Sequence, residues 1–493
     1  MFNSESNYVE LILACEDFSK EDFEKYHCFY KYEENIIAQL MAHGPVLLKG
    51  GRGTGKSALM IEANRRLMDN DKACGIYLSL RHLSLLRSRG ETYEREFLRI
   101  LNDVVKKTAQ DRYSYDFSCE LELYDVQKEI IKFSEHIGKR IVLFFDDAAH
   151  IGRETGLEEF FDIFRTLSSS LVSCKAAIYP GVTRFGTRFD VYNDAKIIDI
   201  SRRYGQQSGF KEFFYEVMKL RYPHQIQEEK YFGSISAEDV AEFLGMSVLG
   251  NVRSFIKGCS LLFEKEGKVT LSTLSETLLA LSSDFFWPMI EEIKYKIGVY
   301  EPLMDSCMNI AEIIYDECGE KKATTFIIHR NLANKFAKPL EILEYAGFIS
   351  KREASRGMKK GGRGTRFAIN LCNTLEKVTG TRLTRELYNE WKNPTVEDVQ
   401  FSANSMFFSE IDLPPIDVDR NIGILELDID KLKKSNVFPY GLTDDKLQRL
   451  KEHGYKKVGE LAEATEGQLK EIYMIGDKTV QRIRSVVEQA IWM

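Results

Sequence analysis

Residues Gly50–Ser57 read Gly-Gly-Arg-Gly-Thr-Gly-Lys-Ser and match the spacing GxxxxGK[ST] at every fixed position. A strand-like apolar stretch precedes them and a helix-like stretch follows, which is the context that this motif requires. Glycines in such a loop let backbone N–H groups close around phosphate oxygens, and the positive end of the following helix adds to the attraction. We expect Lys56 to face the β- and γ-phosphates of ATP and Ser57 to ligate Mg²⁺. The predicted nucleotide-binding set is Gly50, Gly51, Arg52, Gly53, Thr54, Gly55, Lys56, Ser57 and Ala58.

Two adjacent carboxylates, Asp146 and Asp147, follow the apolar run IVLFF. In a parallel sheet they would lie at the edge where the phosphates bind. One carboxylate there holds the metal, usually through water, and the next orients the attacking water. We therefore expect Asp146 to hold Mg²⁺ and Asp147 to be catalytic. The alternative is that both acids cap a following helix.

Further candidates lie downstream of a second strand-like run, KAAIY, in the segment PGVTRFGTRFD. There Thr183 is expected to contact the γ-phosphate or its water, and Arg184 or Arg188 to project toward a neighbouring subunit. In GNVRSFIKG, Arg253 stands at a predicted helix start, from which it can reach back to the nucleotide. A structural salt bridge is the alternative role for each arginine.

Strand-like runs at 75–80, 140–145, 175–179 and 196–200 alternate with helix-period segments such as 157–172. This alternation predicts a parallel sheet with crossover helices. Residues 235–280 are purely helical, as in a small lid. Helix-like runs at 304–317, 325–335 and 339–346, followed by two strand-like runs around a basic loop, are in winged-helix order. An acidic stretch at 391–430 predicts a linker or loosely packed arm.

The order of these motifs, namely the phosphate-binding loop, the Asp-Asp pair, a Thr-bearing strand end and a GNxR-type arginine, resembles AAA+ ATPases. The similarity is to their origin-recognition and initiator-loader branch and covers about residues 30–280. In that family a winged helix follows the lid, which is where residues 304–370 fall. The family usually has Asp-Glu where this chain has Asp146-Asp147, a pair also seen in switch-like signalling NTPases. The shorter Asp147 predicts slow hydrolysis.

Seven basic residues and one acid, Glu353, lie between Lys351 and Arg366 in a glycine-rich loop. Such a flexible loop can bring positive charge to DNA phosphates and release counterions, which gives an affinity that falls with salt. A solvated basic hairpin or a protein-docking wing is the alternative. The candidate DNA-binding residues in this loop are Arg356, Lys359, Lys360, Arg363 and Arg366.

About 50 residues at the end of the sequence resemble the helix-hairpin-helix domain of the bacterial RNA polymerase α subunit. In such hairpins the turn at Gly476 would present backbone N–H groups to a DNA phosphate, with added contacts from Lys478 and Thr479. Hairpins of this kind also dock proteins, so both roles stay open.

The formal net charge of the 493-residue chain is -7, so any DNA contact must come from local basic patches. The sequence has no apolar run near 18 residues and nine scattered cysteines without a CxxC pair, which predicts a cytoplasmic protein with reduced thiols and no membrane association. The fold class that follows is an α/β P-loop NTPase (AAA+) core with a helical lid, a winged helix and a helix-hairpin-helix. The predicted boundaries are 1–230 for the core, 231–300 for the lid, 301–380 for the winged helix, 381–437 for the acidic linker and 438–493 for the helix-hairpin-helix.

Two functions are compatible with this organisation. The first is an ATP- and Mg²⁺-dependent DNA-binding ATPase whose nucleotide state controls DNA engagement or self-association, with a partner ATPase as the other source of the completing arginine. The second is a nucleotide-gated signalling or anti-phage defence switch whose C-terminal half recognises a protein partner.

Overall fold

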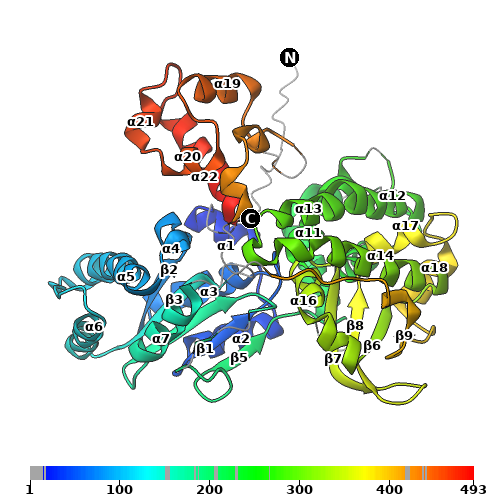
Figure 1. The fold of residues 1–493 in the computed structure, drawn as a ribbon, viewed down its shortest axis with the longest axis horizontal. Coiled ribbons are helices and arrows are strands. Elements are labelled where there is room, and N and C mark those ends of the chain that lie inside the picture. Colours follow the sequence, from blue (N-terminus) through cyan, green and yellow to red (C-terminus); the bar gives the residue numbers. More distant parts are fainter. Residues whose placement is uncertain are drawn as a thin grey trace.

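The computed structural model describes residues 15, 18–149, 156–182, 185–186, 188–204, 209–227, 231–265, 267–416, 422–435, 438 and 441–492. In Figure 1 the first sheet and its helices form the left part of the molecule, a second lobe forms the right part, and the final helices lie above the first sheet. No helix among the described residues combines the length and the apolar character needed to cross a bilayer.

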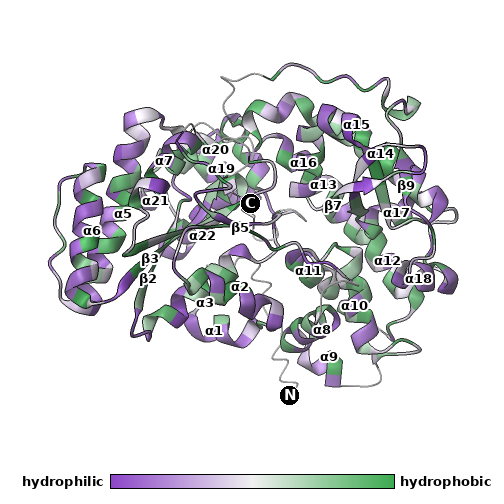
Figure 2. Ribbon diagram, turned by 90° about the horizontal axis from the view of Figure 1, so that it is seen from below, coloured by the Kyte–Doolittle hydropathy of each residue, from purple (hydrophilic) through white to green (hydrophobic). Residues whose placement is uncertain are grey.

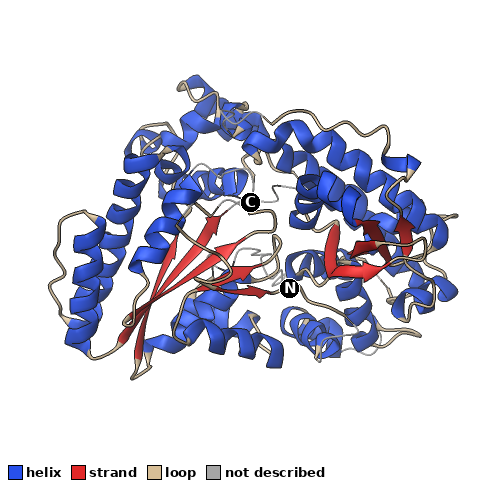
Figure 3. Ribbon diagram, turned by 60° about the horizontal axis from the view of Figure 1, so that its bottom comes forward, coloured by secondary structure: helices blue, strands red, loops and turns tan. Residues whose placement is uncertain are grey.

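The first sheet has five parallel strands in the order β2-β3-β4-β1-β5. All of the strands expected from the sequence are present. Their apolar runs are nearly continuous because helices cover both faces of the sheet (Figure 3). The strands are β1 (Val46–Lys49), β2 (Ala73–Ser79), β3 (Arg140–Ala149), β4 (Val172–Ile178) and β5 (Lys196–Asp199).

Alternate residues of the strands enter two separate cores, as the two-residue period of a strand requires. Val142 and Phe144 of β3 pack under α2 (Lys31–Met41) and α3 (Lys56–Met68). Leu143 and Phe145 pack on the opposite face, under α5 (Gly90–Tyr113), α6 (Leu123–Ile137) and α7 (Leu157–Leu167). In Figure 2 the strands β2 and β3 are coloured hydrophobic, whereas the helices carry both colours. Helix α7 is shorter than the expected 157–172, because β4 begins at Val172.

The segment expected to form a lid, 231–300, is largely helical in its described part. Helices α8 and α9 precede the expected boundary but pack in the same hydrophobic core, so we use the name lid for α8 to α13. Side chains cap its helices: Ser236 accepts a hydrogen bond from the Asp239 N–H, and Asn251 accepts one from the Ser254 N–H. The helices of this region are α8 (Phe210–Arg221), α9 (Pro223–Gln227), α10 (Ala237–Ser247), α11 (Val252–Phe263), α12 (Leu271–Leu281) and α13 (Trp287–Lys294), with a π-helical turn at Ser282–Phe286. The lid shares one continuous hydrophobic core with the next domain.

That next domain, which we call the second-sheet domain (304–411), contains a sheet in the order β7-β8-β6-β9. The helix expected over 325–335 is wrong in its first half: Thr325–His329 is strand β6, because its β-branched, buried residues pair with β8. The elements are α14 (Met304–Lys321), β6, α15 (Arg330–Lys335), α16 (Ala337–Tyr345), β7 (Ile349–Gly357), β8 (Arg363–Ile369), α17 (Leu371–Lys377), α18 (Arg385–Lys392) and β9 (Val399–Phe401).

The segment expected to be an acidic linker contributes to this packing. Helix α18 buries Trp391, and β9 pairs in parallel with β6. The apolar residues Trp391, Val399 and Phe401 account for this order, since each is almost fully buried in the shared core. The acidic composition of the segment predicted a linker, and it gave no indication that these three apolar residues are buried.

Residues 422–492 form a C-terminal domain with its own hydrophobic core. It contains α19 (Asp444–Glu452), α20 (Val458–Glu463), α21 (Glu466–Lys470) and α22 (Asp477–Trp492), after short 3₁₀ turns at Gly423–Glu426 and Ile429–Leu432. Leu83 and Leu86 of α4 (Leu83–Arg87), a helix that follows β2 of the first sheet, pack against this domain. The end of α22 lies near the centre of the molecule in Figure 1, and α1 (Lys20–Tyr26) contacts α8.

Candidate nucleotide-binding site

The glycine-rich loop joins β1 to α3 at the carboxyl edge of the first sheet. Gly53 and Gly55 have φ values of +77° and +97°, which side-chain-bearing residues rarely adopt. Lys56, the first residue of α3, is 5% exposed, and its Nζ donates hydrogen bonds to the carbonyls of Gly50 at 2.8 Å and Gly51 at 3.0 Å. The loop thus turns its backbone and the lysine toward one enclosed space.

Lys56 is surrounded by other charged and aromatic groups. Its Nζ lies 3.6 Å from the centre of the Tyr179 ring. The pKa of Lys56 is lowered to about 7, chiefly by burial; Asp147 and Asp146 oppose this shift, and Arg253 and Arg81 contribute to it. A polyphosphate would counter the clustered positive charge of Lys56, Arg81 and Arg253.

Asp146 and Asp147 lie in β3 and are 1% and 4% exposed. The register of β3 against β4 shifts between Phe145 and Ala149, and Asp147 has a φ of +52°. This irregularity turns consecutive carboxylates toward the same region instead of opposite faces. Asp146 accepts hydrogen bonds from the Tyr77 hydroxyl at 2.6 Å and from the Asp147 N–H at 2.9 Å.

Asp147 is held by two residues that the sequence patterns did not reveal. The Arg81 Nε donates to one carboxylate oxygen at 2.5 Å, and the Tyr179 hydroxyl donates to the other at 3.1 Å. Arg81 follows the end of β2 and Tyr179 directly follows β4, the two neighbours of β3 in the sheet. Because carboxyl ends of parallel strands meet at one edge, this position in the sequence was the available signal.

The lid meets the glycine-rich loop through the start of α11. The Arg253 N–H donates to the Gly53 carbonyl at 3.2 Å, and the Asn251 side-chain amide donates to the Arg52 carbonyl at 2.5 Å. A Cβ on Gly53 would lie 2.7 Å from the Asn251 Oδ1 and 2.8 Å from the Arg253 Cβ. The buried Nε of Arg253 has no hydrogen-bond partner among the described residues. The structure therefore places Arg253 beside the loop, with an Nε–H group that can donate a further hydrogen bond.

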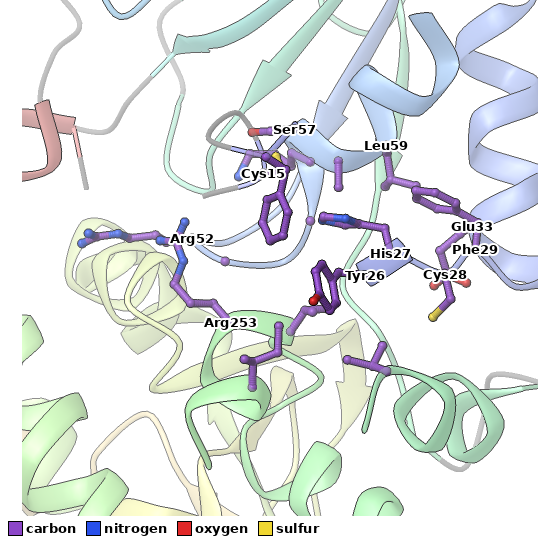
Figure 4. A pocket seen from close by; sticks show the side chains of 18 of the residues that line it. Cys15, Tyr26, His27, Cys28, Phe29, Glu33, Arg52, Ser57, Leu59 and Arg253 are labelled. Atoms are coloured by element: carbon purple, nitrogen blue, oxygen red, sulfur yellow. The ribbon is translucent and has the colours of Figure 1, made fainter. Parts of the chain in front are cut away.

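A cavity that is partly open to solvent lies between the loop, the lid and α1. Its polar wall includes Arg52, Lys56, Ser57, Arg81 and Arg253, and Figure 4 shows Arg52, Ser57 and Arg253 around it. Other parts of the wall are aromatic or aliphatic, which suits a ligand with a charged end and a flat apolar ring. These residues, also missed from the sequence, are Phe18, Tyr26, His27, Phe29, Phe213, Val217, Val252 and Ile256.

His27 and Arg221 are polar groups within this largely apolar wall. The His27 ring stacks on Phe23 with 4.2 Å between ring centres, and its Nδ1 lies 3.0 Å from the Phe23 carbonyl, the geometry of a donated N–H bond. Burial, followed by the charge of Arg221, lowers the pKa of His27 to about 4. Arg221 lies 5.5 Å from the Phe18 ring centre, and within the described part of the chain its buried Nε has no hydrogen-bond partner.

The second-sheet domain also contacts the glycine-rich loop. The Arg52 N–H donates to the carbonyl of Tyr345, at the end of α16, over 3.3 Å. Arg352 of β7 donates to the carbonyl of Arg202 at 3.0 Å, and Arg202 donates in turn to the carbonyl of Thr54 at 2.8 Å. A displacement of the second-sheet domain would therefore break or shift hydrogen bonds to the glycine-rich loop.

Of the three residues predicted downstream of β4, the structure describes Arg188. Thr183 and Arg184 lie outside the described residues. Arg188 is exposed, and its carbonyl accepts a hydrogen bond from Arg165. The role of these residues stays a prediction.

The basic loop between β7 and β8 is exposed, but neighbouring acids compensate much of its charge. Arg356 pairs with Glu353 at 2.6 Å, Arg366 pairs with Asp398 at 2.9 Å, and Lys359 pairs with Glu397. Arg363 donates to the Ser355 carbonyl at 3.0 Å, and Lys360 is exposed. The acids Glu397 and Asp398 come from the segment before β9, which the sequence patterns did not connect with this loop.

At the turn before α22 the residue with positive φ is Met474, at +64°, and Gly476 is not among the described residues with positive φ. A Cβ on Gly476 would meet no described atom within 4 Å. The Thr479 N–H is already bonded to the Gly476 carbonyl at 2.9 Å, while Lys478 is exposed. Tyr473 and Met474 project from the turn, 75% and 69% exposed. Exposed apolar side chains thus lie beside the turn at which a phosphate contact is predicted, and that contact stays a prediction.

No protein-family model matches the chain, and no curated protein is similar to it. Solved structures with similarity include Cdc6p from Pyrobaculum aerophilum, with 11% identity, 74% of this chain and 98% of that chain covered, and a TM-score of 0.34. The Aeropyrum pernix ORC1 protein in complex with DNA is 11% identical, with 73% of this chain and 91% of that chain covered and a TM-score of 0.34. The RuvB Holliday junction branch migration motor of Thermotoga maritima is 12% identical, with 76% of this chain and 95% of that chain covered and a TM-score of 0.31. Identities and scores this low assign no activity or partner to this chain.

Proposed function

We propose that the protein is an ATPase that binds Mg²⁺-ATP between the glycine-rich loop, the lid and α1. The observation that carries this proposal is the convergence of Lys56, Arg253 and the two residues that hold Asp147, Arg81 and Tyr179, on one cavity with an aromatic wall. The loop N–H groups and Lys56 would hold the phosphates, and Arg253 would bind them from the lid.

The residues also fit a magnesium ion. Ser57 lines the cavity, and Asp146 is buried with each of its oxygens hydrogen-bonded, so it would best reach a metal through water. Mg²⁺ would neutralise charge on the β- and γ-phosphates. Asp147, held at the edge of β3 by Arg81 and Tyr179, would orient the attacking water.

We further propose that nucleotide state controls the placement of the second-sheet domain, which has winged-helix order and carries the basic loop. The contact between the Arg52 N–H and the Tyr345 carbonyl supports this link. In the resembling AAA+ family, such a module engages duplex DNA, and self-association or a partner ATPase completes the site. We take DNA engagement as the first candidate function.

The signalling or defence switch is the second candidate, and two observations favour it. Asp147 is bound by both Arg81 and Tyr179, which suits slow turnover. The basic loop has its own acids, and the hairpin tip is apolar, which suits a protein partner better than DNA.

Three measurements test the nucleotide site. Lys56→Ala should abolish ATP binding in equilibrium dialysis, because the lysine is the principal charge toward the β- and γ-phosphates. Asp147→Asn should keep ATP binding and lose most hydrolysis. Lys72→Ala, an exposed lysine near the start of β2, is the matched control and should behave as wild type. Unchanged ATP affinity in Lys56→Ala would exclude the proposed site.

The ATPase rate with and without duplex DNA separates the two candidate functions. Stimulation by DNA that disappears at high salt supports DNA engagement. A slow rate that DNA leaves unchanged, together with capture of a protein through residues 438–492, supports the switch.

A further inference from the structure

Trp492, at the end of α22, lines the same cavity as Lys56, Ser57 and Arg253. It is 8% exposed and belongs to the hydrophobic core of the C-terminal domain. A residue from the last described helix therefore forms part of the wall around the proposed nucleotide site. In the sequence this domain lies far from every nucleotide motif.

The C-terminal domain has a second contact with the catalytic edge of the first sheet. Leu83 and Leu86 of α4 pack against its core. Helix α4 begins just after Arg81, and the Arg81 Nε holds the Asp147 carboxylate at 2.5 Å. The domain thus meets both the wall of the cavity and the helix beside the residue that orients Asp147.

We infer that the C-terminal domain is a nucleotide-sensing cap: bound nucleotide contacts Trp492 and thereby fastens this domain onto the ATPase core. The inference rests on the proposed nucleotide site. Trp492 is one of the residues that line the space between the glycine-rich loop, the lid and α1, so the indole borders that space. A ligand that touches a wall formed by two domains binds the docked arrangement better than the undocked one, and so shifts the equilibrium toward docking.

The coupling is reciprocal. If nucleotide favours docking, an intact docked domain must favour nucleotide by the same factor. Replacing Trp492 by Ala removes an aromatic contact, which typically weakens binding about three- to tenfold. If the Trp492 side chain instead blocked the cavity, its replacement by Ala would tighten nucleotide binding; we call this alternative a plug.

Tryptophan emission tests the contact in the full-length protein. The chain has three tryptophans, and two of them pack in the core that the lid and the second-sheet domain share. The Trp287 indole N–H donates to Glu376 at 3.1 Å, and the Trp391 indole N–H donates to the Lys322 carbonyl at 3.2 Å. Unlabelled ATP should change the emission of wild type and of Trp287→Phe, and Trp492→Phe should lose this change. An unaltered ATP response in Trp492→Phe would overturn the inference.

Affinity and hydrogen exchange give independent readouts. Trp492→Ala should weaken ATP binding about three- to tenfold, whereas Tyr473→Ala, an exposed aromatic in the same domain, should not. ATP should slow exchange of the α22 amides in wild type and have no effect in Lys56→Ala. Because the exchange readout uses the wild-type domain, it remains decisive if Trp492→Ala disturbs folding.

The outcomes separate the two proposals. Absence of ATP binding in wild type would remove the nucleotide site itself. Lys56-dependent ATP binding with unchanged α22 exchange and unchanged affinity in Trp492→Ala would keep the site and exclude the cap. Tighter binding in Trp492→Ala would exclude the cap in favour of a plug.

Discussion

Acidification should detach α1 from the cavity wall through His27. The pKa of this histidine is about 4 in the folded protein, because of burial and the charge of Arg221, compared with an ordinary value near 6.5. Between these values the unfolded segment binds a proton that the folded one does not. Folding stability therefore rises with pH: the contribution of His27 is fully present above about 6.5 and is lost as the pH falls toward 4.

The two pKa values set the size of the effect. Lowering the pH from 7 to 5 should cost about 2 kcal/mol in the stability of α1 docking, which is roughly a twentyfold increase in its opening constant. Hydrogen exchange of the amides in Lys20–Tyr26, corrected for the intrinsic pH dependence of exchange, measures this opening.

Variants isolate the histidine from other titrating groups. His27→Phe keeps an aromatic ring beside Phe23 but cannot bind a proton, so α1 opening in this variant should lose most of its pH dependence. His453→Gln removes an exposed histidine of the C-terminal domain and should leave α1 unaffected. Equal pH dependence of α1 opening in wild type and His27→Phe would refute the role of this histidine.

Three further predictions concern the loop, the lid and the basic hairpin. Gly53→Ala and Gly55→Ala both place an alanine at positive φ, which costs about 1 kcal/mol in each variant. Gly53→Ala should lower stability to urea further, because the new Cβ would lie 2.7 Å from Asn251. The new Cβ in Gly55→Ala would meet no described atom within 4 Å. Equal losses would show that the lid does not press on the loop. Asn251→Ala should lower both thermal stability, by about 1 kcal/mol for the lost helix cap, and ATP affinity, whereas Asn251→Asp should keep the cap and lose only the amide bond to the loop. Glu397→Gln with Asp398→Asn should raise DNA affinity, because the paired Lys359 and Arg366 become available to phosphates. The slope of log affinity against log salt concentration should steepen by about one unit for each additional phosphate that the loop neutralises. An unchanged slope in binding titrations would mean that these basic side chains do not face DNA.

Much of the candidate site could be located from sequence because its parts are local. Gly50–Ser57 is contiguous, and its strand and helix are recognisable on either side. The apolar run before Asp146 and Asp147 places the acids at the strand end, and parallel strands share one such edge. Arg253 beside its capping residue Asn251 is likewise a short-range pattern.

Other features depended on tertiary packing. Thr325–His329 has a composition compatible with helix or strand, and pairing with β8 decided it. The charge of the basic loop is compensated by Glu397 and Asp398, which reach it because β9 pairs with β6. Periodicity describes the face of one segment and carries no information about which distant segment covers it.

The sequence by itself determined which groups meet in the candidate site: a loop of glycines with Lys56, and the carboxylates of Asp146 and Asp147 near the carboxyl end of a strand, whose geometry follows from local backbone rules. Only the tertiary structure decided what surrounds that chemistry. Arg81 and Tyr179 hold Asp147 because neighbouring strands end beside it, and Trp492 enters the cavity wall because the C-terminal core packs on α4. Such contacts join segments far apart in the chain, and their free energy comes from the burial of shared surface, which no single segment encodes.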